Sequence, residues 1–189
     1  MLEHLPHGFG RALRGLRSGV DELVWTMPDA DAAPDVIVVT SPAFLDGEPM
    51  PSRYTQDSRL KCSPPLAWRG APIEAAAAVL IVEDPDSPTP VPLVHAVAWN
   101  LPVADDIEEG ALNPTDGTAG RLGWNSFHKL GWLAPDPPPG HGPHRYVFQV
   151  FALDRPLSFD KTPTRKEVVA ALKGRICAKG RLTGTYERF

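Results

Sequence analysis

YVFQVFAL, residues 146–153, is the segment that decides the fold class, because aromatic and β-branched residues follow one another over the length of a strand. Three more segments predict strands, namely VIVVT at 36–40, AAAVLIV at 76–82 and the alternating HAVAW at 95–99. Helical spacing appears only towards the two ends of the chain. Strands and long loops between terminal helices favour a mostly β (α+β) domain built on a sheet over alternating βαβ units.

The stretch 10–24 has the spacing of an amphipathic helix. Its apolar side chains fall on one face and its arginines mostly lie elsewhere: Leu13, Leu16, Val20 and Leu23 against Arg11, Arg14 and Arg17. A basic amphipathic helix can lie on a membrane surface. This one is short and has a single aromatic residue nearby, Trp25, which favours docking on protein instead. We therefore expect the helix to pack across the core of its own domain or to form a homodimer.

The chain length of 189 residues fits one large domain that buries its core without help from disulfides or metal. Residues 26–34 (MPDADAAPD) have the composition of a linker. We therefore divide the chain into an N-terminal extension over residues 1–35, with the short helix and the linker, and a single domain over 36–189.

A second helix is predicted from Thr164 to Lys173. Thr164 is a suitable N-cap, Glu167 stands three residues on as its capping-box partner, and Gly174 can end the helix. The remaining segment, 176–186, predicts a last helical turn followed by a short strand.

Composition excludes several classes of protein. The formal net charge of −4 argues against bulk affinity for nucleic acid, and no apolar run reaches the 18 residues of a membrane span. Arg11, Arg14 and Arg17 interrupt any signal-peptide core, so we expect a cytoplasmic protein. Cys62 and Cys177 form no CxxC pair, which leaves zinc and redox chemistry without support and favours free thiols. The 22 prolines are spread through the apolar runs and predict many turns and edge positions, not disorder.

The first polar cluster is Asp84-Pro85-Asp86, which directly follows an apolar run. The prolines on either side of Asp86 fix φ and remove backbone donors, so the loop is stiff. If the stretch is extended, the spacing places both carboxylates on the same side. The alternative is a solvated acidic turn.

The second polar cluster is His144-Arg145-Tyr146, at the start of the strongest strand. His144 and Tyr146 share one face of that strand and Arg145 points the other way. A histidine and a tyrosine hydroxyl that converge can donate hydrogen bonds to an anion. The alternative is a histidine whose bonds are satisfied at a strand edge.

Metal binding is the weaker interpretation of the same residues. His95 heads its own strand, and two histidines with two aspartates can form a metal site. His141 and His144 add an HxxH spacing, but it lies in a Pro/Gly loop and not on a helix. The long loop 120–141 is typical of functional loops, and its aromatic residues either wall a pocket or pin the loop to the core: Trp124, Phe127 and Trp132. We expect no cofactor.

An ordered set of motifs resembles a known family. The set runs through Phe44, Gly47, Pro51 and Arg53-Tyr54-Thr55, then Ser63-Pro64-Pro65-Leu66 with Trp68, Asp84-Pro85-Asp86-Ser87-Pro88, His95 with Trp99-Asn100-Leu101-Pro102, Pro137-Pro138, His144-Arg145-Tyr146, Ala152-Leu153-Asp154 and Gly184-Thr185-Tyr186-Glu187-Arg188. Over residues 36–189 the chain looks like the phosphatidylethanolamine-binding protein family, in its bacterial Raf kinase inhibitor-like branch. The fixed order of the motifs is far more specific than any one of them.

The resemblance implies a two-sheet β-sandwich with peripheral helices and a small anion pocket at one end. The family's pocket motif maps onto Asp84, Pro85, Asp86, His95, His144 and Tyr146. Members bind phosphate-type head groups or simple anions there, and eukaryotic members are linked to lipid binding and to inhibition of kinases or proteases. Two departures alter the pocket's walls: Ala96 stands where tryptophan is common, and Asp136 adds negative charge near the rim.

The sequence leaves three function classes. A binding or regulatory module for phosphorylated head groups or protein segments is favoured. An Asp/His hydrolase acting on a phosphorylated or ester substrate is the alternative, although no nucleophile elbow or two-metal spacing is present. The third is an inhibitor that acts on a partner enzyme through a loop. In the binding module, Asp84 or Asp86 bonds to a histidine and keeps it cationic, so anion affinity falls as rising pH removes the proton. A protonated aspartate that donates to the anion gives the same sign.

Overall fold

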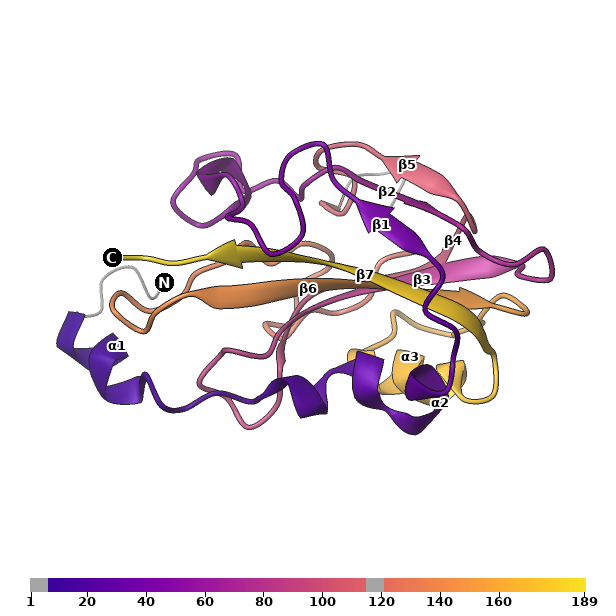
Figure 1. Ribbon diagram of the computed structural model, residues 1–189, viewed down its shortest axis with the longest axis horizontal. Helices are drawn as coiled ribbons and strands as arrows, with labels where there is room; N and C mark the ends of the chain where they lie inside the picture. The colour runs from indigo at the N-terminus through magenta and orange to yellow at the C-terminus, as the bar shows by residue number, and fades with distance from the viewer. Residues whose placement is uncertain (1–6, 115–120) are drawn as a thin grey trace.

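Two antiparallel sheets face each other in the computed structural model, which describes residues 7–114 and 121–189 (Figure 1). The larger sheet has the order β4-β3-β6-β7 and is made of Leu93–Leu101 (β4), Ala77–Asp84 (β3), His144–Leu153 (β6) and Ile176–Tyr186 (β7). The smaller sheet has the order β1-β2-β5 and is made of Val38–Thr40, Leu66–Arg69 and Asp105–Ile107. The predicted mostly β, two-sheet architecture is confirmed.

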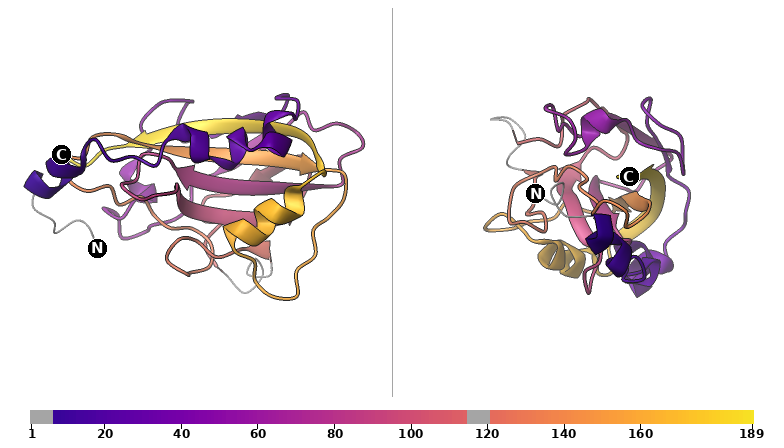
Figure 2. Two further views of the ribbon diagram at one scale, coloured as in Figure 1. Left: turned by 90° about the horizontal axis from the view of Figure 1, so that it is seen from below. Right: turned by 90° about the vertical axis from the view of Figure 1, so that its left-hand side faces the viewer.

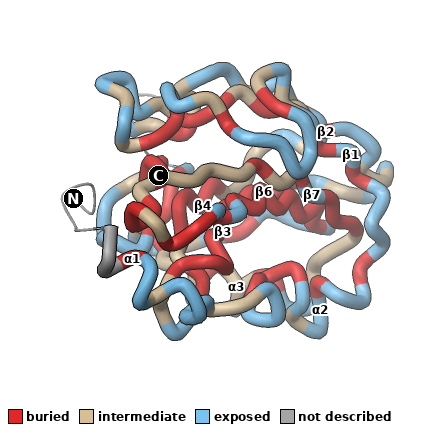
Figure 3. Tube along the Cα trace, turned by 60° about the vertical axis from the view of Figure 1, so that its left-hand side comes forward, coloured by how far each residue is buried: buried red, intermediate tan, exposed pale blue. Residues whose placement is uncertain are grey.

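The central strand β3 is buried on both faces, which explains its unbroken apolar sequence. Leu80 and Val82 point into the core between the two sheets, where they join residues such as Trp68. Val79 and Ile81 point the other way, into a second core beneath the helices. Figure 3 shows the buried positions concentrated along the central strands. Because side chains alternate along a strand, the single strand β3 contributes to both cores.

Short helical segments cover the outer face of the larger sheet. They are the 3₁₀ turns Val20–Glu22 and Val24–Thr26, α2 (Pro28–Asp31) and α3 (Arg165–Leu172). The helix α1 (His7–Leu13) lies beyond the end of the sheet, against the loop before β6, and a further 3₁₀ turn, Ser52–Tyr54, lies beside the smaller sheet (Figure 1). Figure 2 shows the N-terminal segment and α3 lying across this face. In the part of the chain that the structure describes, no helix is both long and apolar enough to cross a membrane.

The predicted continuous helix over 10–24 is wrong beyond Leu13. The chain turns at Gly15, and Gly19 has a φ of 92°, which only glycine adopts without strain. The Gly19 amide donates to the Pro85 carbonyl, so this stretch bonds to another loop instead of to itself. Tertiary hydrogen bonds have overridden the helical spacing.

Two further expectations need correction. The expected linker 26–34 contains the single-turn helix α2. The expected helical turn at 176 is absent, because β7 runs as one strand from Ile176 to Tyr186 and pairs along its length with β6. The C-terminal helix is confirmed: Thr164 caps α3, and Glu167 completes the capping box.

The N-terminal segment packs on its own domain. Leu23, Val24 and Trp25 are buried in the second core. The Val24 amide donates to Glu83 and the Trp25 amide donates to Gln149, two polar side chains that lie fully buried on the outer face of the sheet. One of the two expected roles of this stretch, packing across the core, is therefore the observed one, and the homodimer stays a prediction.

Candidate functional site

A cavity of about 310 Å³ opens where β3 ends and β6 begins. Because these two strands are antiparallel neighbours, the end of one lies beside the start of the other, and β4 flanks them. Most of its lining is apolar. The lining residues are Asp84, Ser87, Pro88, Thr89, Leu93, His95, Phe127, Leu133, Ala134, Asp136, Pro137, Pro138 and His144.

Three of the six predicted site residues line this cavity: Asp84, His95 and His144. Asp84 is the last residue of β3 and His144 the first of β6, while His95 lies near the start of β4. Residues between 11 and 60 positions apart in the chain thus meet at one end of the sheet. The other three, Pro85, Asp86 and Tyr146, lie next to the cavity without lining it.

The Asp84 carboxylate is fixed by two hydrogen bonds. Its Oδ1 accepts from the Asp86 amide at 2.8 Å, which closes a tight turn, and its Oδ2 lies 2.7 Å from His144 Nδ1. Both side chains are almost completely buried. The expected pairing of a site aspartate with a site histidine is therefore the observed one, between these two residues.

His95 has one nitrogen bonded and one open. Its Nδ1 lies 2.5 Å from the carbonyl oxygen of Leu133, and since a carbonyl only accepts, Nδ1 carries the hydrogen. Nε2 is buried and has no hydrogen-bond partner among the described residues. Burial is the largest effect on the pKa of His95 and lowers it, so the ring is neutral near pH 7 and Nε2 is an acceptor.

His144 has no open nitrogen. Nδ1 faces Asp84, and Nε2 lies 2.7 Å from His141 Nδ1. His144 therefore presents ring carbons to the cavity. His141 is itself fully buried and does not line the cavity.

Asp86 faces away from the cavity towards two arginines. It accepts three hydrogen bonds from the backbone and side chain of Arg145, and it lies 2.7 Å from Arg17 Nη1. Burial disfavours the ionised carboxylate, but the bonds from Arg145 and Arg17 outweigh burial and hold the pKa of Asp86 at about 2. The two carboxylates of the Asp-Pro-Asp segment thus bond to different partners, Asp84 to a histidine and Asp86 to arginines.

Pro85 and Tyr146 support the cavity from behind. The Pro85 carbonyl accepts from the Gly19 amide and the Ser18 hydroxyl. The Tyr146 ring is fully buried and lies edge-on to the His95 ring, with centroids 5.0 Å apart. Burial raises the pKa of Tyr146 well above its usual value, so the phenol stays neutral. His144 and Tyr146 both point inward while Arg145 is exposed, as the strand pattern predicts.

The two departures from the family pattern have different outcomes. Ala96 is buried in the core between the sheets and does not line the cavity. Asp136 does line it, and its carboxylate lies 2.5 Å from Arg188, which also pairs with Asp57. The added negative charge near the rim is therefore paired with Arg188, a cation that it shares with Asp57.

The aromatic residues of the long loop, described from residue 121, divide between the two expected roles. Phe127 lines the cavity and is 55% exposed. Trp132 stacks on Phe148 and donates from its indole nitrogen to the Tyr54 carbonyl, which pins the loop to the core. Trp124 does not line this cavity.

Sequence reasoning missed two neighbours of the site, His141 and Arg17. The HxxH spacing drew attention to His141, but as a metal motif, whereas the structure shows a bond between the two histidines. Nothing in the sequence signals the contact of Arg17 with Asp86, because it joins positions far apart in the chain. Within residues 7–114 and 121–189, no group of three metal-ligating side chains comes together.

Known proteins with similar sequences include two of a single named group. A UPF0098 protein of Pyrococcus abyssi is 37% identical over 157 residues, which cover 80% of this chain and 86% of the relative. A UPF0098 protein of Chlamydia trachomatis is also 37% identical, over 79% of this chain and 98% of its own length.

Solved structures are similar as well. The crystal structure of a putative phosphatidylethanolamine-binding protein homolog, CT736 from Chlamydia trachomatis, superposes with a TM-score of 0.72 at 35% identity, covering 82% of this chain and 99% of its own. YbcL of E. coli, described as a new member of the mammalian PEBP family, gives 0.73 at 28% identity, covering 81% and 99%. A sequence model described as phosphatidylethanolamine-binding protein matches residues 40–187. The chain therefore belongs to the phosphatidylethanolamine-binding protein family.

Proposed function

We propose that the cavity binds a small anion or a phosphorylated head group, and that the protein is a binding module of this family's type. The observation that carries the proposal is the open Nε2 of His95, buried in a cavity whose other walls are mostly apolar. A buried polar atom without a partner is unfavourable. A ligand that supplies the missing hydrogen bond therefore gains both that bond and the burial of its apolar part.

Two forms of the complex satisfy His95. Either the ring takes up a proton and Nε2–H donates to an anion oxygen, or the neutral ring accepts from the hydroxyl of a monoprotonated phosphate. The charge of Asp84 does not oppose either form strongly, because His144 and the Asp86 amide already bond to it. Both forms bind one proton more than the free protein and the fully ionised ligand.

The proposal predicts that affinity rises as the pH falls. His95 has a lowered pKa and is neutral near pH 7, so an anion that needs the Nε2–H must bring about proton uptake. We expect calorimetric titrations with phosphoethanolamine, a phosphomonoester whose dianion carries no hydroxyl, to give tighter binding at pH 5.5 than at pH 8. Sulfate carries no proton in this range, so the same dependence with sulfate assigns the proton to the protein, and its loss in His95→Gln assigns it to His95. Equal phosphoethanolamine affinity at both pH values contradicts the proposal.

A variant links binding to His95. His95→Gln replaces the ionisable ring by a carboxamide that cannot take up a proton, so the hydrogen bond loses its charge assistance and phosphate binding is expected to weaken by about 10-fold. His128→Asn is the matched control, because His128 is an exposed histidine outside the cavity whose φ of 53° suits asparagine. Unchanged affinity in His95→Gln, or an equal loss in both variants, argues against the site.

The source of the phosphate is a second question for the same assay. The apolar lining, with Pro88, Leu93 and Pro138, suits a ligand whose phosphate is attached to carbon. Phosphoethanolamine that binds more tightly than inorganic phosphate supports a head group, and the reverse order supports a free anion. A regulatory or inhibitory role on a partner enzyme such as a kinase is the finer form of this proposal.

A hydrolase is the less favoured function. The Asp84–His144 bond resembles the aspartate that orients a catalytic histidine. However, the other nitrogen of His144 faces His141 and not a hydroxyl nucleophile. A screen for phosphatase and esterase activity, with His144→Ala as the control, separates the two functions.

A further inference from the structure

A chain of hydrogen bonds joins the pocket to the N-terminal extension. It runs from Asp84 Oδ2 to His144 Nδ1 at 2.7 Å, and from His144 Nε2 to His141 Nδ1 at 2.7 Å. It then runs from His141 Nε2 to the carbonyl oxygen of Leu13 at 2.9 Å. Both imidazole rings are buried, so water does not compete for these positions. The last acceptor lies 128 residues from His141.

The hydrogen-bond chain from Asp84 to Leu13 requires a definite number of ring hydrogens. Each of the three links needs one hydrogen, whereas two neutral imidazoles supply two and an ionised carboxylate supplies none. The complete hydrogen-bond chain therefore holds one proton more than two neutral histidines and an ionised Asp84 would carry. The Leu13 carbonyl only accepts, so His141 Nε2 carries a hydrogen. Burial, followed by the neighbouring His144, lowers the pKa of His141, so this ring stays neutral and its Nδ1 accepts from His144.

The extra proton therefore lies between His144 and Asp84. An imidazole is more basic than a carboxylate, so the proton resides on the histidine. His144 is thus the cationic partner of a charged Asp84. The charged and titratable groups around this hydrogen-bond chain are Asp84, Asp86, Arg14, Arg17, Arg145, His95 and Tyr146. Asp86 pairs with Arg17 and Arg145 and offsets one of their two positive charges. The positive charge left over opposes a cationic His144, whereas the direct bond to Asp84 at 2.7 Å favours it.

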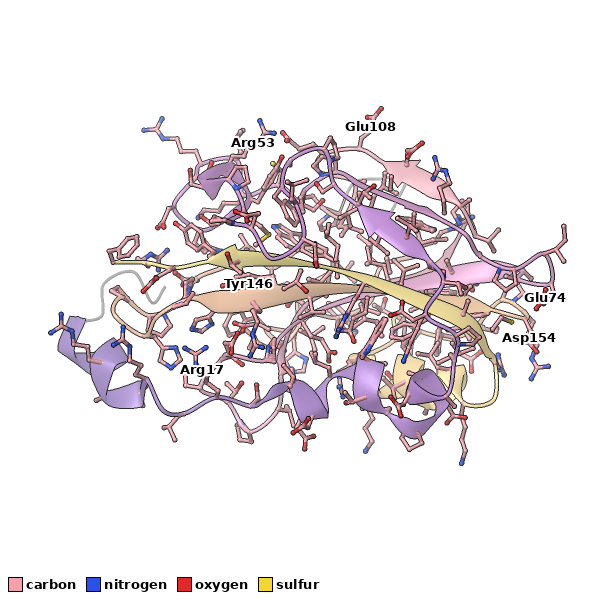
Figure 4. All side chains as sticks on the ribbon, in the orientation of Figure 1. Arg17, Arg53, Glu74, Glu108, Tyr146 and Asp154 are labelled. Atoms are coloured by element: carbon pink, nitrogen blue, oxygen red, sulfur yellow. The ribbon has the colours of Figure 1, made fainter. Side chains whose placement is uncertain are left out.

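The Leu13 carbonyl is held in place by a segment that we name the N-terminal strap, residues 13–19. Arg17 pairs with Asp86 and donates to the Pro143 carbonyl. The Ser18 amide donates to the Ser87 carbonyl, and the Gly19 amide to that of Pro85. The strap therefore bonds to both loops that carry the site histidine and aspartate. Figure 4 shows Arg17 beside the start of β6, on the same end of the molecule as Tyr146.

The helix α1 packs so closely on the loop of His141 that no residue larger than glycine fits at position 10. A Cβ added at Gly10 would lie 2.1 Å from the Pro139 carbonyl oxygen and 2.9 Å from the His141 amide nitrogen. A Cβ added at Gly15 would have no atom within 4 Å. Gly10 thus fixes the distance between α1 and the loop of His141, and the two glycines form a matched pair for testing that contact.

We propose that His141 is a positioning residue of the pocket, and that the N-terminal strap, through the Leu13 carbonyl, holds His144 as the doubly protonated partner of Asp84. The strap lies outside the segment 40–187 that the family shares. A segment outside the shared region therefore sets the charge state of a site built from shared motifs. This inference extends the proposed function, but its geometry does not depend on the identity of the ligand.

The test follows the ring nitrogens of His144 by NMR in the full chain labelled with ¹⁵N-histidine. The midpoint is the pH at which His144 loses its second ring hydrogen. His141→Leu removes the acceptor for His144 Nε2–H while keeping an apolar side chain of similar size. We expect the midpoint to fall by about one to two pH units, the effect of one hydrogen bond to a charged group. His141→Gln can still accept from His144 and donate to the Leu13 carbonyl, so it restores the midpoint at least in part.

The strap is tested by the two glycines. Gly10→Ala, which changes no charge, is expected to lower the midpoint in the same direction, and Gly15→Ala to leave it unchanged. A midpoint in His141→Leu equal to that of the wild type overturns the proposal, as does equal lowering in His141→Leu and His141→Gln, which would show a loss of packing only. An unchanged midpoint in Gly10→Ala overturns the role of the strap. Because no ligand enters this measurement, failure of phosphate binding contradicts the proposed function and leaves this result standing.

Discussion

Asp86 bonds to both the strand β6 and the N-terminal strap. Arg145 approaches from its own strand through three hydrogen bonds, and Arg17 approaches from the N-terminal strap. A buried carboxylate with so many donors is far more acidic than one in an unfolded chain. Asp86 therefore links the stability of the fold to pH.

Acid should remove this contribution selectively. The pKa of Asp86 is about 2 in the folded protein against 3.8 as the ordinary value. Because the folded value is the lower one, the stabilisation is full above pH 3.8 and is lost as the pH falls towards about 2. We expect urea unfolding to show the wild type losing about 2 kcal/mol relative to Asp86→Asn over that range. A stability difference that stays constant with pH would contradict this role.

At the scale of single residues, the sequence predicts which residues lie at the site, but it does not predict which partners they bond to. Asp84, His95 and His144 were expected at the site and do line the cavity. The Asp-x-Asp spacing, however, does not reveal that Asp86 turns towards arginines, because the partner Arg17 is supplied by tertiary folding. In the same way, the spacing of His141 and His144 suggests shared ligation, while their rings bond to each other.

At the scale of elements, local signals are the reliable ones. The helix α3 was predicted because its cap, its capping-box partner and its stop lie within ten residues of one another. The strand β7 was misread in part, because its first residues become a strand only by pairing with β6. The helix expected over 10–24 ends early because the strap exchanges its own helical bonds for bonds to the loop at Pro85.

The cap of α3 provides a direct test at this scale. Thr164 accepts from the Glu167 amide, and Glu167 accepts from the Thr164 amide. Thr164→Ala is expected to lower the free energy of unfolding by about 1 kcal/mol, as measured by urea denaturation. Thr164→Ser, which keeps the hydroxyl, is the matched control and should retain most of the stability. Similar losses in the two variants would show that the hydroxyl does not act as a cap.

At the scale of the whole molecule, the N-terminal extension from residue 20 to residue 33 is part of the packed structure. It brings Leu23, Val24 and Trp25 into the second core and supplies backbone donors to Glu83 and Gln149. Arg165 of α3 bonds to the same glutamate, so the extension and the C-terminal helix share one buried acceptor. The motif pattern could not predict this arrangement, because it lies outside the motifs.

Two leucines of the extension distinguish packing from exposure. Leu23 is 1% exposed and Leu16 is 56% exposed, although both belong to the same expected helical face. Leu23→Ala is expected to reduce the free energy of unfolding by about 2–5 kcal/mol, and Leu16→Ala by less than about 0.5 kcal/mol. Light scattering on the same variants tests the predicted homodimer. A lower mass in Leu16→Ala would support it, and equal unfolding losses would contradict the packing described here.

The N-terminal strap has a consequence for how members of this family can differ from one another. The shared segment encodes the shape of the pocket, while Leu13 and Arg17, from outside that segment, bond to His141 and Asp86 next to the pocket. Two relatives with the same motifs and different N-terminal extensions would then share a binding cavity and differ in the acidity at which it works. Substitutions in the N-terminal strap would then change that acidity without altering a residue of the cavity wall.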